Sequence, residues 1–307
     1  MLHFESMKSA SEVFKALSAP MRIKIMEILY DDGDKNLNDL ANMLNLTNSA
    51  ISLHIKKLEE VGLIEIHTMS GKRGSMKICK PLHDTLIIDL LPKKIDIASY
   101  QDEIEIGYYS NCQVVATCGI ATKDHIIGEF DDPRYFSFPE HFQASVLWFS
   151  SGFIEYNLPN HLIAGQKLTE LQLSFEISSE SPGFNENYPS DIHFSINNSN
   201  LGHWVSPGDF GARRGRLVPN WWPKICNQYG RLKTLSINNK GTFIDGGYQI
   251  SAITIDDLKL DYTSAISFCF SVPKDTENVG GFTLFGEGFG DYNQSIRMQT
   301  FYEIKES

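Results

Sequence analysis

The sequence lacks any apolar stretch long enough to cross a membrane. Its longest apolar stretch, LIIDLL, is far shorter than the ~20 residues that a membrane-spanning helix needs. The first residues, MLHFESMKSASE, carry acids and have no apolar segment of the kind found in signal peptides. We therefore expect a cytoplasmic protein that has no membrane partner.

Cysteine is also scarce. Five cysteines scattered over 307 residues do not form the pattern of a disulfide framework, and they fit a reducing compartment. Cys112 and Cys118 frame the segment CQVVATC, and His125 follows seven residues later. A zinc site there would need another ligand, and buried free thiols are common. We predict no metal and no other cofactor.

Positive charge is in short supply, which argues against DNA binding only at first sight. The chain has 27 Lys and Arg against 38 Asp and Glu, a net charge of -11. Residues 1–92 hold 11 basic and 12 acidic residues, so most of the acidic excess lies later in the chain. Residues 46–80 hold six basic and three acidic residues. Because salt screens charges beyond ~8 Å, this local basic region decides contact with phosphate.

Two domains are expected from the length, since ~150 residues per domain is the usual guide. Apolar residues recur at helical spacing over residues 9–95, whereas short alternating runs such as LTELQLSFEI and AISFCFSV follow residue 108. The join lies near LLPKKIDIASYQDEIE. We predict an α+β multidomain chain, with a largely helical domain at residues 1–96 and a β domain at residues 97–307.

A helix-turn-helix is predicted around residues 37–60. LNDLANMLNL forms a short amphipathic helix, and Thr47 is a good N-cap for the next one, whose apolar stripe includes Ile51, Ile55 and Leu58. The tight join between two helices is typical of this motif. The predicted DNA-binding residues on or near the second helix are Thr47, Asn48, Ser49, Ser52, His54 and Lys56.

A basic hairpin follows the second helix. The segments LIEIHT and SMKICK are predicted strands on either side of SGKRG. Lys72 and Arg73 lie at the predicted turn, where they could grip the DNA backbone as a wing does. They complete the predicted DNA-binding set.

These residues resemble the ArsR-type winged helix-turn-helix regulators over about the first ninety residues. The family motif L-S-x-P-x-R is matched by Leu17, Ser18, Pro20 and Arg22. The serine and histidine of the family's recognition helix are matched by Ser52 and His54. The motif L-x-x-x-G-L, which ends that helix, is matched by Leu58, Gly62 and Leu63. The resemblance implies a homodimeric transcriptional regulator that dimerises through its first and last helices, here residues 9–19 and 83–96. The cysteine pair of metal-sensing members is absent from LNDLANMLNL, so metal sensing at that position is not expected.

The second domain is expected to be an antiparallel β-sandwich of the jelly-roll kind, with a barrel as the alternative. Two loops, residues 201–230 and 280–294, gather aromatic, acidic, glycine and arginine residues. Aromatic rings stack on the C–H faces of sugars, and Asp and Arg bind hydroxyls, so these loops predict a saccharide site. The candidate ligand-binding residues are Trp204, Asp209, Arg213, Arg214, Trp221, Trp222, Tyr229, Glu287, Asp291, Tyr292 and Asn293.

The runs SPGDFGARRGRLVPNWW and GGFTLFGEGFGDYNQ resemble the β domain that is fused to ArsR-type helices in some Firmicute regulators, and this resemblance implies an association with sugar metabolism. We therefore expect a sequence-specific homodimeric repressor that responds to a saccharide and is not an enzyme. Two alternatives stay open: a DNA-tethered carbohydrate-active enzyme that uses Glu287, and a regulator whose β domain only binds other proteins.

Overall fold

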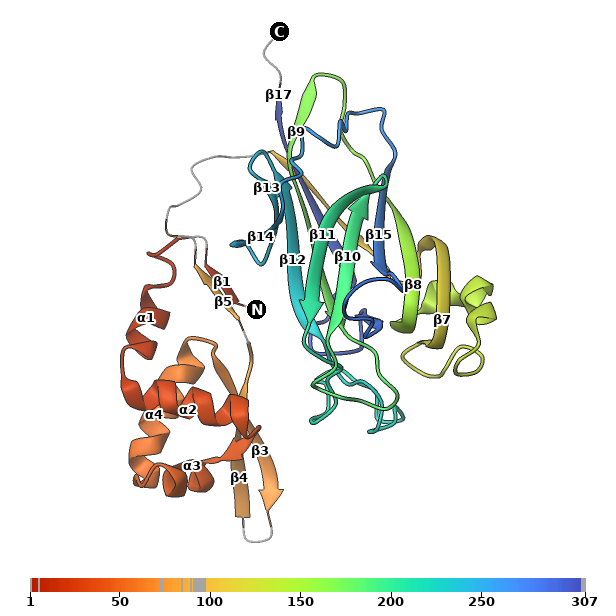
Figure 1. Cartoon of the computed structure of the whole chain (residues 1–307). Helices are drawn as coiled ribbons and strands as arrows, with labels where there is room; N and C mark the ends of the chain where they lie inside the picture. The colour runs from red at the N-terminus through yellow and green to blue at the C-terminus, as the bar shows by residue number, and fades with distance from the viewer. Residues whose placement is uncertain are drawn as a thin grey trace. The chain divides into compact units, whose positions relative to one another are not determined.

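The computed structural model describes residues 2–4, 6–71, 74–83, 85–88, 90 and 98–304, apart from the side chains of residues 69–71, 74 and 75. The chain divides into two compact units, Met1–Asp96 and Ile97–Ser307 (Figure 1). Each unit is described by itself. None of the helices within the described ranges has the length and apolar character needed to cross a membrane.

The first unit contains a helix-turn-helix and a small sheet. Its elements are β1 (Leu2–Phe4), α1 (Ser11–Leu17), α2 (Pro20–Asp31), β2 (Lys35–Asn36), α3 (Leu37–Met43), α4 (Asn48–Glu60), β3 (Ile64–Gly71), β4 (Gly74–Pro81) and β5 (Leu86–Ile88). Strands β2, β4 and β3 form an antiparallel three-stranded sheet in that order. This helix order and the β3–β4 hairpin are those of a winged helix-turn-helix.

One core holds this unit together. It combines Ile25 and Leu29 of α2, Leu40 of α3, Ile51 of α4 and Cys79 of β4, all of which are buried. Pro20 opens α2, where its missing N–H removes no helical hydrogen bond. The apolar stripes that the sequence shows at helical spacing therefore face one another.

The prediction of a helix over residues 83–96 is wrong at Leu86–Ile88. These residues form β5, which pairs in parallel with β1, Leu2 opposite Leu86. Ile87 and Ile88 are β-branched, which favours an extended backbone, and β1 provides a partner for them. The rest of the expected helix, from residue 91, lies outside the described residues.

The second unit consists mainly of β-strands. In chain order its elements are β6 (Ser99–Ile104), β7 (Tyr109–Ala121), η1 (Pro133–Ser137), η2 (Pro139–Gln143), β8 (Val146–Leu158), β9 (Gln166–Ser178), β10 (Ser190–Ile196), β11 (Ser199–Ser206), β12 (Arg231–Asn238), β13 (Gly241–Ile244), β14 (Tyr248–Ser251), β15 (Ile266–Val272), β16 (Phe282–Phe285) and β17 (Ile296–Ile304). The elements η1 and η2 are 3-10 helices.

These strands form two layers that are joined at one place. One layer has the order β7-β8-β15-β10-β11, and the other has the order β6-β17-β9-β12-β13-β14. The short strand β16 pairs with β8 on one side and with β9 on the other, so it links the layers. The strand pairs within residues 98–304 are antiparallel. The predicted fold class, a winged helix-turn-helix followed by an antiparallel β-sandwich of the jelly-roll kind, is confirmed.

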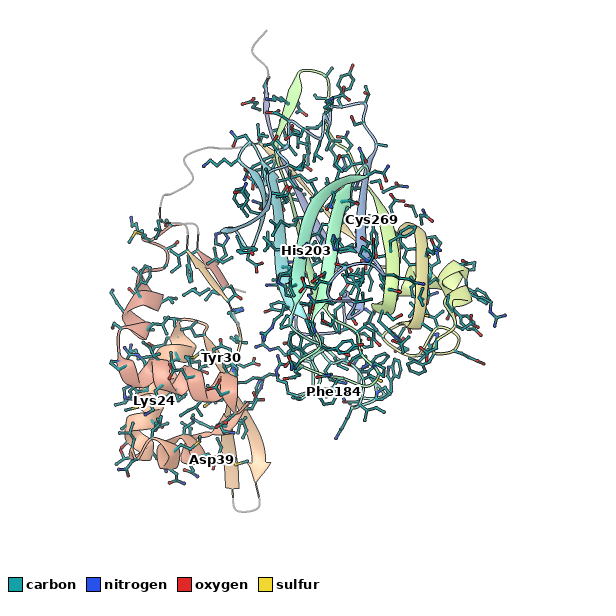
Figure 2. All side chains as sticks on the ribbon, viewed as in Figure 1. Lys24, Tyr30, Asp39, Phe184, His203 and Cys269 are labelled. Carbon is teal, nitrogen blue, oxygen red and sulfur yellow. The ribbon has the colours of Figure 1, made fainter. Side chains whose placement is uncertain are left out.

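Alternation along the strands builds the main core between the layers. In β15, Ile266, Phe268, Phe270 and Val272 are buried and alternate with less buried residues. Side chains fill the space between the two layers (Figure 2). The loops that follow β9 and β11 gather at one end of the sandwich (Figure 1), where the backbone N–H of Ser179 donates to the carbonyl of Gly208. That end carries the candidate ligand site.

Candidate functional site

The helix α4 has the cap and the buried stripe that its sequence predicts. The Thr47 hydroxyl accepts a hydrogen bond from the backbone N–H of Ala50 at 3.2 Å, which satisfies one of the free amides of the first turn. Ile51, Ile55 and Leu58 are buried in the core of the first unit. The opposite face of α4 is therefore free to meet another surface.

The predicted DNA-binding residues lie unevenly around this outer face. Asn48, Ser49, Ser52 and Lys56 are exposed, as is Thr47 before the helix. The Ser52 hydroxyl donates to the backbone carbonyl of Asn48 at 2.7 Å. His54 is half-buried, because it follows the helix round toward the buried stripe.

The sequence reasoning missed one residue in this surface, which is Leu53. Its side chain is 69 % exposed, and its place in the helix is almost opposite Ile51 and Ile55. Single exposed apolar side chains are common on protein surfaces, so Leu53 matters here because it lies at the centre of the face that carries the predicted DNA-binding residues. The sequence did contain a signal for Leu53: it follows Ser49 by four residues and precedes Lys56 by three, and residues at these spacings lie on the same face of a helix.

The positive charge beside this face is partly neutralised. Glu60 accepts from Lys57 at 2.7 Å and lies 4.0 Å from Lys56. Because the three side chains are exposed, the ion pairs are weak and a phosphate can replace the glutamate as their partner. Lys72 and Arg73, predicted at the wing tip, lie outside the described residues.

In the second unit, the structure brings several predicted ligand residues together. They contact one another and hold the two loops in place. Arg213 forms a bidentate ion pair with Asp291, one of whose hydrogen bonds measures 3.0 Å. Its guanidinium lies 3.6 Å from the centre of the Tyr229 ring. The two predicted loops, residues 201–230 and 280–294, are thereby tied to each other.

A buried carboxylate lies beneath this ion pair. Glu176, on the outer face of β9, is fully buried and accepts from the backbone N–H groups of Gly230, Asp291 and Tyr292 at 2.7 to 3.0 Å. Burial and then the charge of Asp291 raise the pKa of Glu176 to about 8, although the three N–H donors lower it. A Cβ at residue 290 would lie 2.5 Å from the carboxylate oxygens, so this position requires Gly290.

The other predicted ligand residues do not form one site. Trp204 lies on β11 with the Lys233 ammonium 4.7 Å from its ring centre, and Arg214 donates to the backbone carbonyls of Val218 and Pro219. The Trp221 indole donates to the carbonyl of Lys123. Two further predicted residues, Glu287 and Asn293, are exposed. Tyr292 is half-buried and takes part through its backbone N–H.

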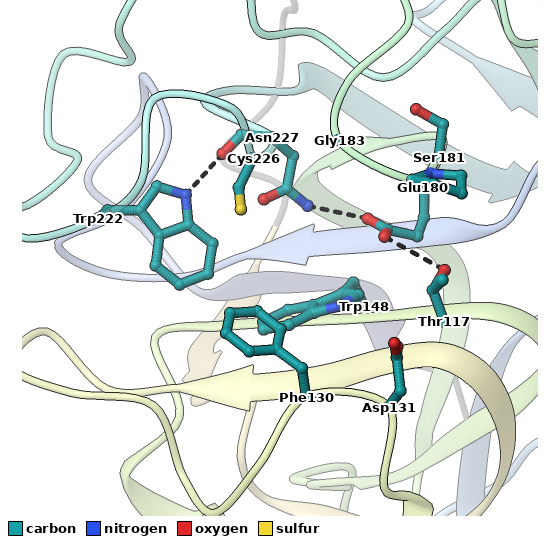
Figure 3. A pocket seen from close by; sticks show the side chains of 11 residues that line it. Thr117, Phe130, Asp131, Trp148, Glu180, Ser181, Gly183, Trp222, Cys226 and Asn227 are labelled. Carbon is teal, nitrogen blue, oxygen red and sulfur yellow. Dashed lines mark hydrogen bonds between the residues drawn. The ribbon is translucent and has the colours of Figure 1, made fainter.

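A pocket of about 270 Å³ lies close to these loops. Its rings are Phe130, Trp148 and Trp222. Trp222, 2 % exposed, is the predicted ligand residue that lines it. Figure 3 shows the rings along one side and the carboxyl group of Glu180 opposite them. The pocket therefore has an apolar aromatic wall and a polar wall.

The aromatic wall is held in place by packing and by one hydrogen bond. Trp148 and Trp222 meet edge to face with their ring centres 5.6 Å apart, and Phe130 lies 5.7 Å from Trp148. The Trp222 indole donates to the carbonyl of Asn227 at 2.8 Å. A Cβ at residue 119 would lie 2.2 Å from the Trp148 ring, so Gly119 lets this ring lie against β7.

The polar wall centres on Glu180, which is 8 % exposed. Its carboxyl group accepts from the Asn227 amide at 3.1 Å and from the hydroxyls of Thr117 and Thr283 at 3.4 and 3.3 Å. Burial, and then the charge of Asp209, raises the pKa of Glu180 well above its ordinary value. These neutral donors orient the carboxyl group without providing a counter-ion.

Asp209, a predicted ligand residue, lies behind this wall. It is fully buried and accepts from the backbone N–H and the hydroxyl of Ser181, a pocket residue, at 3.1 and 3.3 Å. Burial raises the pKa of Asp209 to about 7. Its other oxygen, Oδ1, has no hydrogen-bond partner among the residues that the structure describes. Asp209 thus acts on the pocket through Ser181 and through its charge.

Most of the pocket was missed by the sequence reasoning. Thr117, Phe130, Trp148 and Glu180 come from segments outside the two predicted loops. The available signals were weak: Trp148 lies in the strand-like run SVLWFS, and Glu180 lies in the serine-rich segment SSESPG after LQLSFEI. Neither pattern indicates that loops cover that face of the sheet.

The cysteines are free thiols. Cys118 lies in the sandwich core and Cys112 packs against it, whereas Cys226 packs against the cluster that contains Trp148 and Trp222. Cys118 is fully buried, whereas Cys112 and Cys226 are half-buried. Burial raises the pKa of Cys226, which lines the pocket, to about 11. Within the described parts of the chain, His, Cys, Asp and Glu side chains do not converge in groups of three or more that could hold a metal ion.

The fold and the α4 surface define the first unit as a winged helix-turn-helix DNA-binding domain. Residues 20–65 match the family model described as winged helix-turn-helix DNA-binding. An uncharacterized HTH-type transcriptional regulator of Methanocaldococcus jannaschii is 41 % identical over 75 residues, which make up 24 % of this chain and 78 % of that protein. The chain belongs to the HTH-type transcriptional regulators and is a DNA-binding protein.

A solved structure is similar over a larger part of the chain but at low geometric agreement. It is the family 11 carbohydrate-binding module from Clostridium thermocellum in complex with a mixed-linked tetrasaccharide. The identity is 15 %, the match covers 70 % of this chain and 94 % of the module, and the TM-score is 0.24. At that TM-score the likeness supports no conclusion about the ligand.

Proposed function

We propose that this regulator is a cytoplasmic homodimeric repressor of the ArsR type that binds a saccharide in the pocket between Trp148 and Glu180, and that the sugar changes its affinity for an operator. The observation that carries the proposal is the pocket itself. Aromatic rings and a buried carboxyl group face one cavity in a chain whose other unit binds DNA.

The DNA-binding part of the proposal rests on the outer face of α4. Its exposed polar residues, Ser49 and Ser52 among them, suit hydrogen bonds to base edges, and Lys56 suits phosphate contact. An α-helix fits the major groove with such a face toward the bases. Lys72 and Arg73 are proposed to contact the backbone beside the groove.

The second part of the proposal is that the chain dimerises through α1. Phe14 of α1 is exposed although it is large and aromatic, and a second copy of the helix would cover it. The last helix of the family arrangement is not available at Leu86–Ile88, which form β5. A dimer would place two α4 helices in successive major grooves of a near-palindromic site. Light scattering should give a dimer for the wild type and a monomer for Phe14→Glu.

The saccharide assignment follows from the two walls of the pocket. Rings stack on the C–H face of a sugar, while a carboxyl group and an amide bind its hydroxyls. A volume of about 270 Å³ lies just below the ~300–1,000 Å³ that ligand pockets usually span. One sugar ring is therefore the proposed size of the ligand.

Repression and its release are proposed to follow a population shift. A sugar that binds two conformations with different affinity shifts their populations by that difference and by no more. A coupling of ~1–3 kcal/mol would change operator affinity by roughly 5- to 150-fold. Operator binding by the full chain, measured by fluorescence anisotropy with and without sugar, measures this coupling directly.

A thermal-shift screen of monosaccharides on the full chain tests the ligand. A sugar at 100 times its Kd should stabilise the second unit by about 2.7 kcal/mol. Phe130→Ala should abolish the shift, whereas Phe138→Ala should preserve it, since these rings are 48 % and 49 % exposed but only Phe130 lines the pocket. Hydrolysis of a bound glycoside that disappears in Glu180→Gln would instead assign an enzyme. If no sugar shifts the melting temperature, the saccharide assignment is wrong.

A further inference from the structure

The pocket has an unusual charge balance. Two of its lining residues, Asp131 and Glu180, carry carboxyl groups, and Lys, Arg and His are absent from the described lining. Asp209 adds a third acid directly behind Ser181. A ligand in this cavity therefore meets acidic groups and, among the described lining residues, no side-chain cation.

This balance excludes several sugars that a regulator could sense. A phosphate or carboxylate group on the ligand would find no side-chain cation to pair with among the described lining residues, and it would lie beside the acidic groups of Asp131 and Glu180. The neutral donors near Glu180, the Asn227 amide and the Thr117 hydroxyl, already bind its carboxyl oxygens. Sugar phosphates and sugar acids are thus poor candidates.

A cation, in contrast, matches both walls. The carboxyl group of Glu180 and that of Asp131 both lie on the polar side (Figure 3), and an ionised Glu180 has no cationic partner among the described residues that line the pocket. On the other side, the rings of Phe130, Trp148 and Trp222 attract a cation through their π-faces. One positively charged group on a sugar would interact with both the carboxyl groups and the aromatic rings.

We propose that the ligand is an amino sugar with a free ammonium group, which pairs with Glu180 while the sugar ring stacks against the Trp148 side of the pocket. This inference rests on the proposed saccharide function and narrows it to one chemical class. Asp131 supplies a second negative charge for the same ammonium group.

The ion pair predicts a proton release. Burial raises the pKa of Glu180, and the acidic groups of Asp209 and Asp131 raise it further. The thiol of Cys226, which also faces Glu180, is neutral and does not contribute. In the empty pocket the carboxyl group is therefore protonated at pH values where a solvated glutamate is ionised. A bound ammonium ion stabilises the carboxylate, so the carboxyl proton passes to the buffer as the ion pair forms.

Isothermal titration calorimetry of the full chain at pH 6.5 tests this inference. D-glucosamine, N-acetyl-D-glucosamine, D-glucose and D-glucosamine 6-phosphate are the probes, each titrated in two buffers with different ionisation enthalpies. We expect D-glucosamine to bind at least ten-fold more tightly than the other three, with an enthalpy that depends on the buffer. The neutral sugars should show no such dependence.

Three variants assign the effect to the pocket. Glu180→Gln should reduce D-glucosamine affinity to the level of D-glucose and remove the buffer dependence. Asp131→Asn should weaken D-glucosamine several-fold without weakening D-glucose. It should also fold normally, because asparagine tolerates the positive φ of 64° at this position. Glu287→Gln, an exposed acid outside the pocket, is the matched control and should bind like the wild type.

The failures are distinguishable. D-glucose or N-acetyl-D-glucosamine binding as tightly as D-glucosamine would overturn the amino-sugar inference and leave the saccharide function in place. Tightest binding of D-glucosamine 6-phosphate would do the same. Unchanged D-glucosamine binding by both Glu180→Gln and Asp131→Asn would place the amine elsewhere and overturn the inference. No binding of any of these sugars, or of any in the wider screen, would overturn the saccharide function together with the inference.

Discussion

Leu53 provides the sharpest test of how this regulator reads DNA. Its side chain is 69 % exposed at the centre of the outer face of α4, and it has no hydrogen-bonding group. In the major groove the apolar feature of a base pair is the thymine 5-methyl group. We predict that Leu53 contacts one thymine methyl in each half-site.

The size of the effect follows from the buried group. Burying one methyl group contributes ~0.8 kcal/mol, which corresponds to roughly a four-fold change in Kd. Replacing the critical thymine by uracil removes the methyl group and leaves the hydrogen-bonding groups unchanged. A dT→dU change at that position should therefore weaken wild-type binding about four-fold per half-site.

The assay begins with an operator selected from random duplexes by the full chain. Each thymine of one half-site is then replaced singly by uracil, and affinity is measured by fluorescence anisotropy at constant salt. The wild type should show one sensitive position. Leu53→Ala should bind the dT and dU duplexes equally, whereas Met43→Ala, an exposed apolar residue on α3, should keep the wild-type preference.

Two results would refute the reasoning. The first is equal wild-type binding to every dU duplex, which would mean that no thymine methyl is contacted. The second is a preference for dT that survives in Leu53→Ala, which would assign the contact to another residue. Either result would show that Leu53 does not contact a thymine methyl group.

Three further predictions concern the wing and the second unit. Lys72→Ala with Arg73→Ala should weaken operator and random DNA alike and reduce the slope of log K against log salt by about two per protomer, as titration with salt would measure. Gly290→Ala should lower the melting temperature by roughly 5 to 15 °C. The φ of 69° at this position is strained for alanine, and the added Cβ would lie 2.5 Å from the carboxylate oxygens of Glu176. The two effects together cost roughly 2 to 4 kcal/mol. Gly246→Ala, with φ of 77° and open space, is the control and should lose less. Asp209 has a pKa of about 7, so the folded state keeps a proton that the unfolded chain has released, and stability should fall as pH rises from about 4 to about 7. Asp209→Asn should reduce this loss of stability by up to ~4 kcal/mol, because each unit of pKa shift corresponds to ~1.4 kcal/mol. Denaturant titrations of the wild type and the variant across this pH range measure the difference.

The first unit was predictable because its signals are local. Thr47 was placed as the N-cap of α4, and the strands of the hairpin were placed on either side of the SGKRG turn. A cap and a helical stripe depend on neighbours within four residues. The helix expected over residues 83–96 failed at Leu86–Ile88, since pairing with Leu2–Phe4 depends on a segment more than eighty residues away.

The second unit was predictable in class and much less so in its site. Alternating runs such as that of Ile266–Val272 specify strands and a buried face. They do not specify which loops meet. Arg213 and Asp291 were both expected at a ligand, and the structure does bring them together, but as partners of each other. Pairings between residues 78 apart in sequence leave no periodic trace.

Glu176 shows why the predicted loops and the pocket nonetheless belong together. In β9 the odd positions from Leu171 to Ile177 face the main core, so an acid at an even position would ordinarily be solvated. Glu176 is fully buried because the two loops cover that face, and its carboxylate binds the backbone of both at Gly230 and Asp291. The loop that ends at Gly230 also carries Trp222 and Asn227, which line the pocket. The loops singled out by their aromatic and charged residues thus supply one ring and one amide to the pocket directly, while Arg213 and Asp291 hold those groups in place from behind.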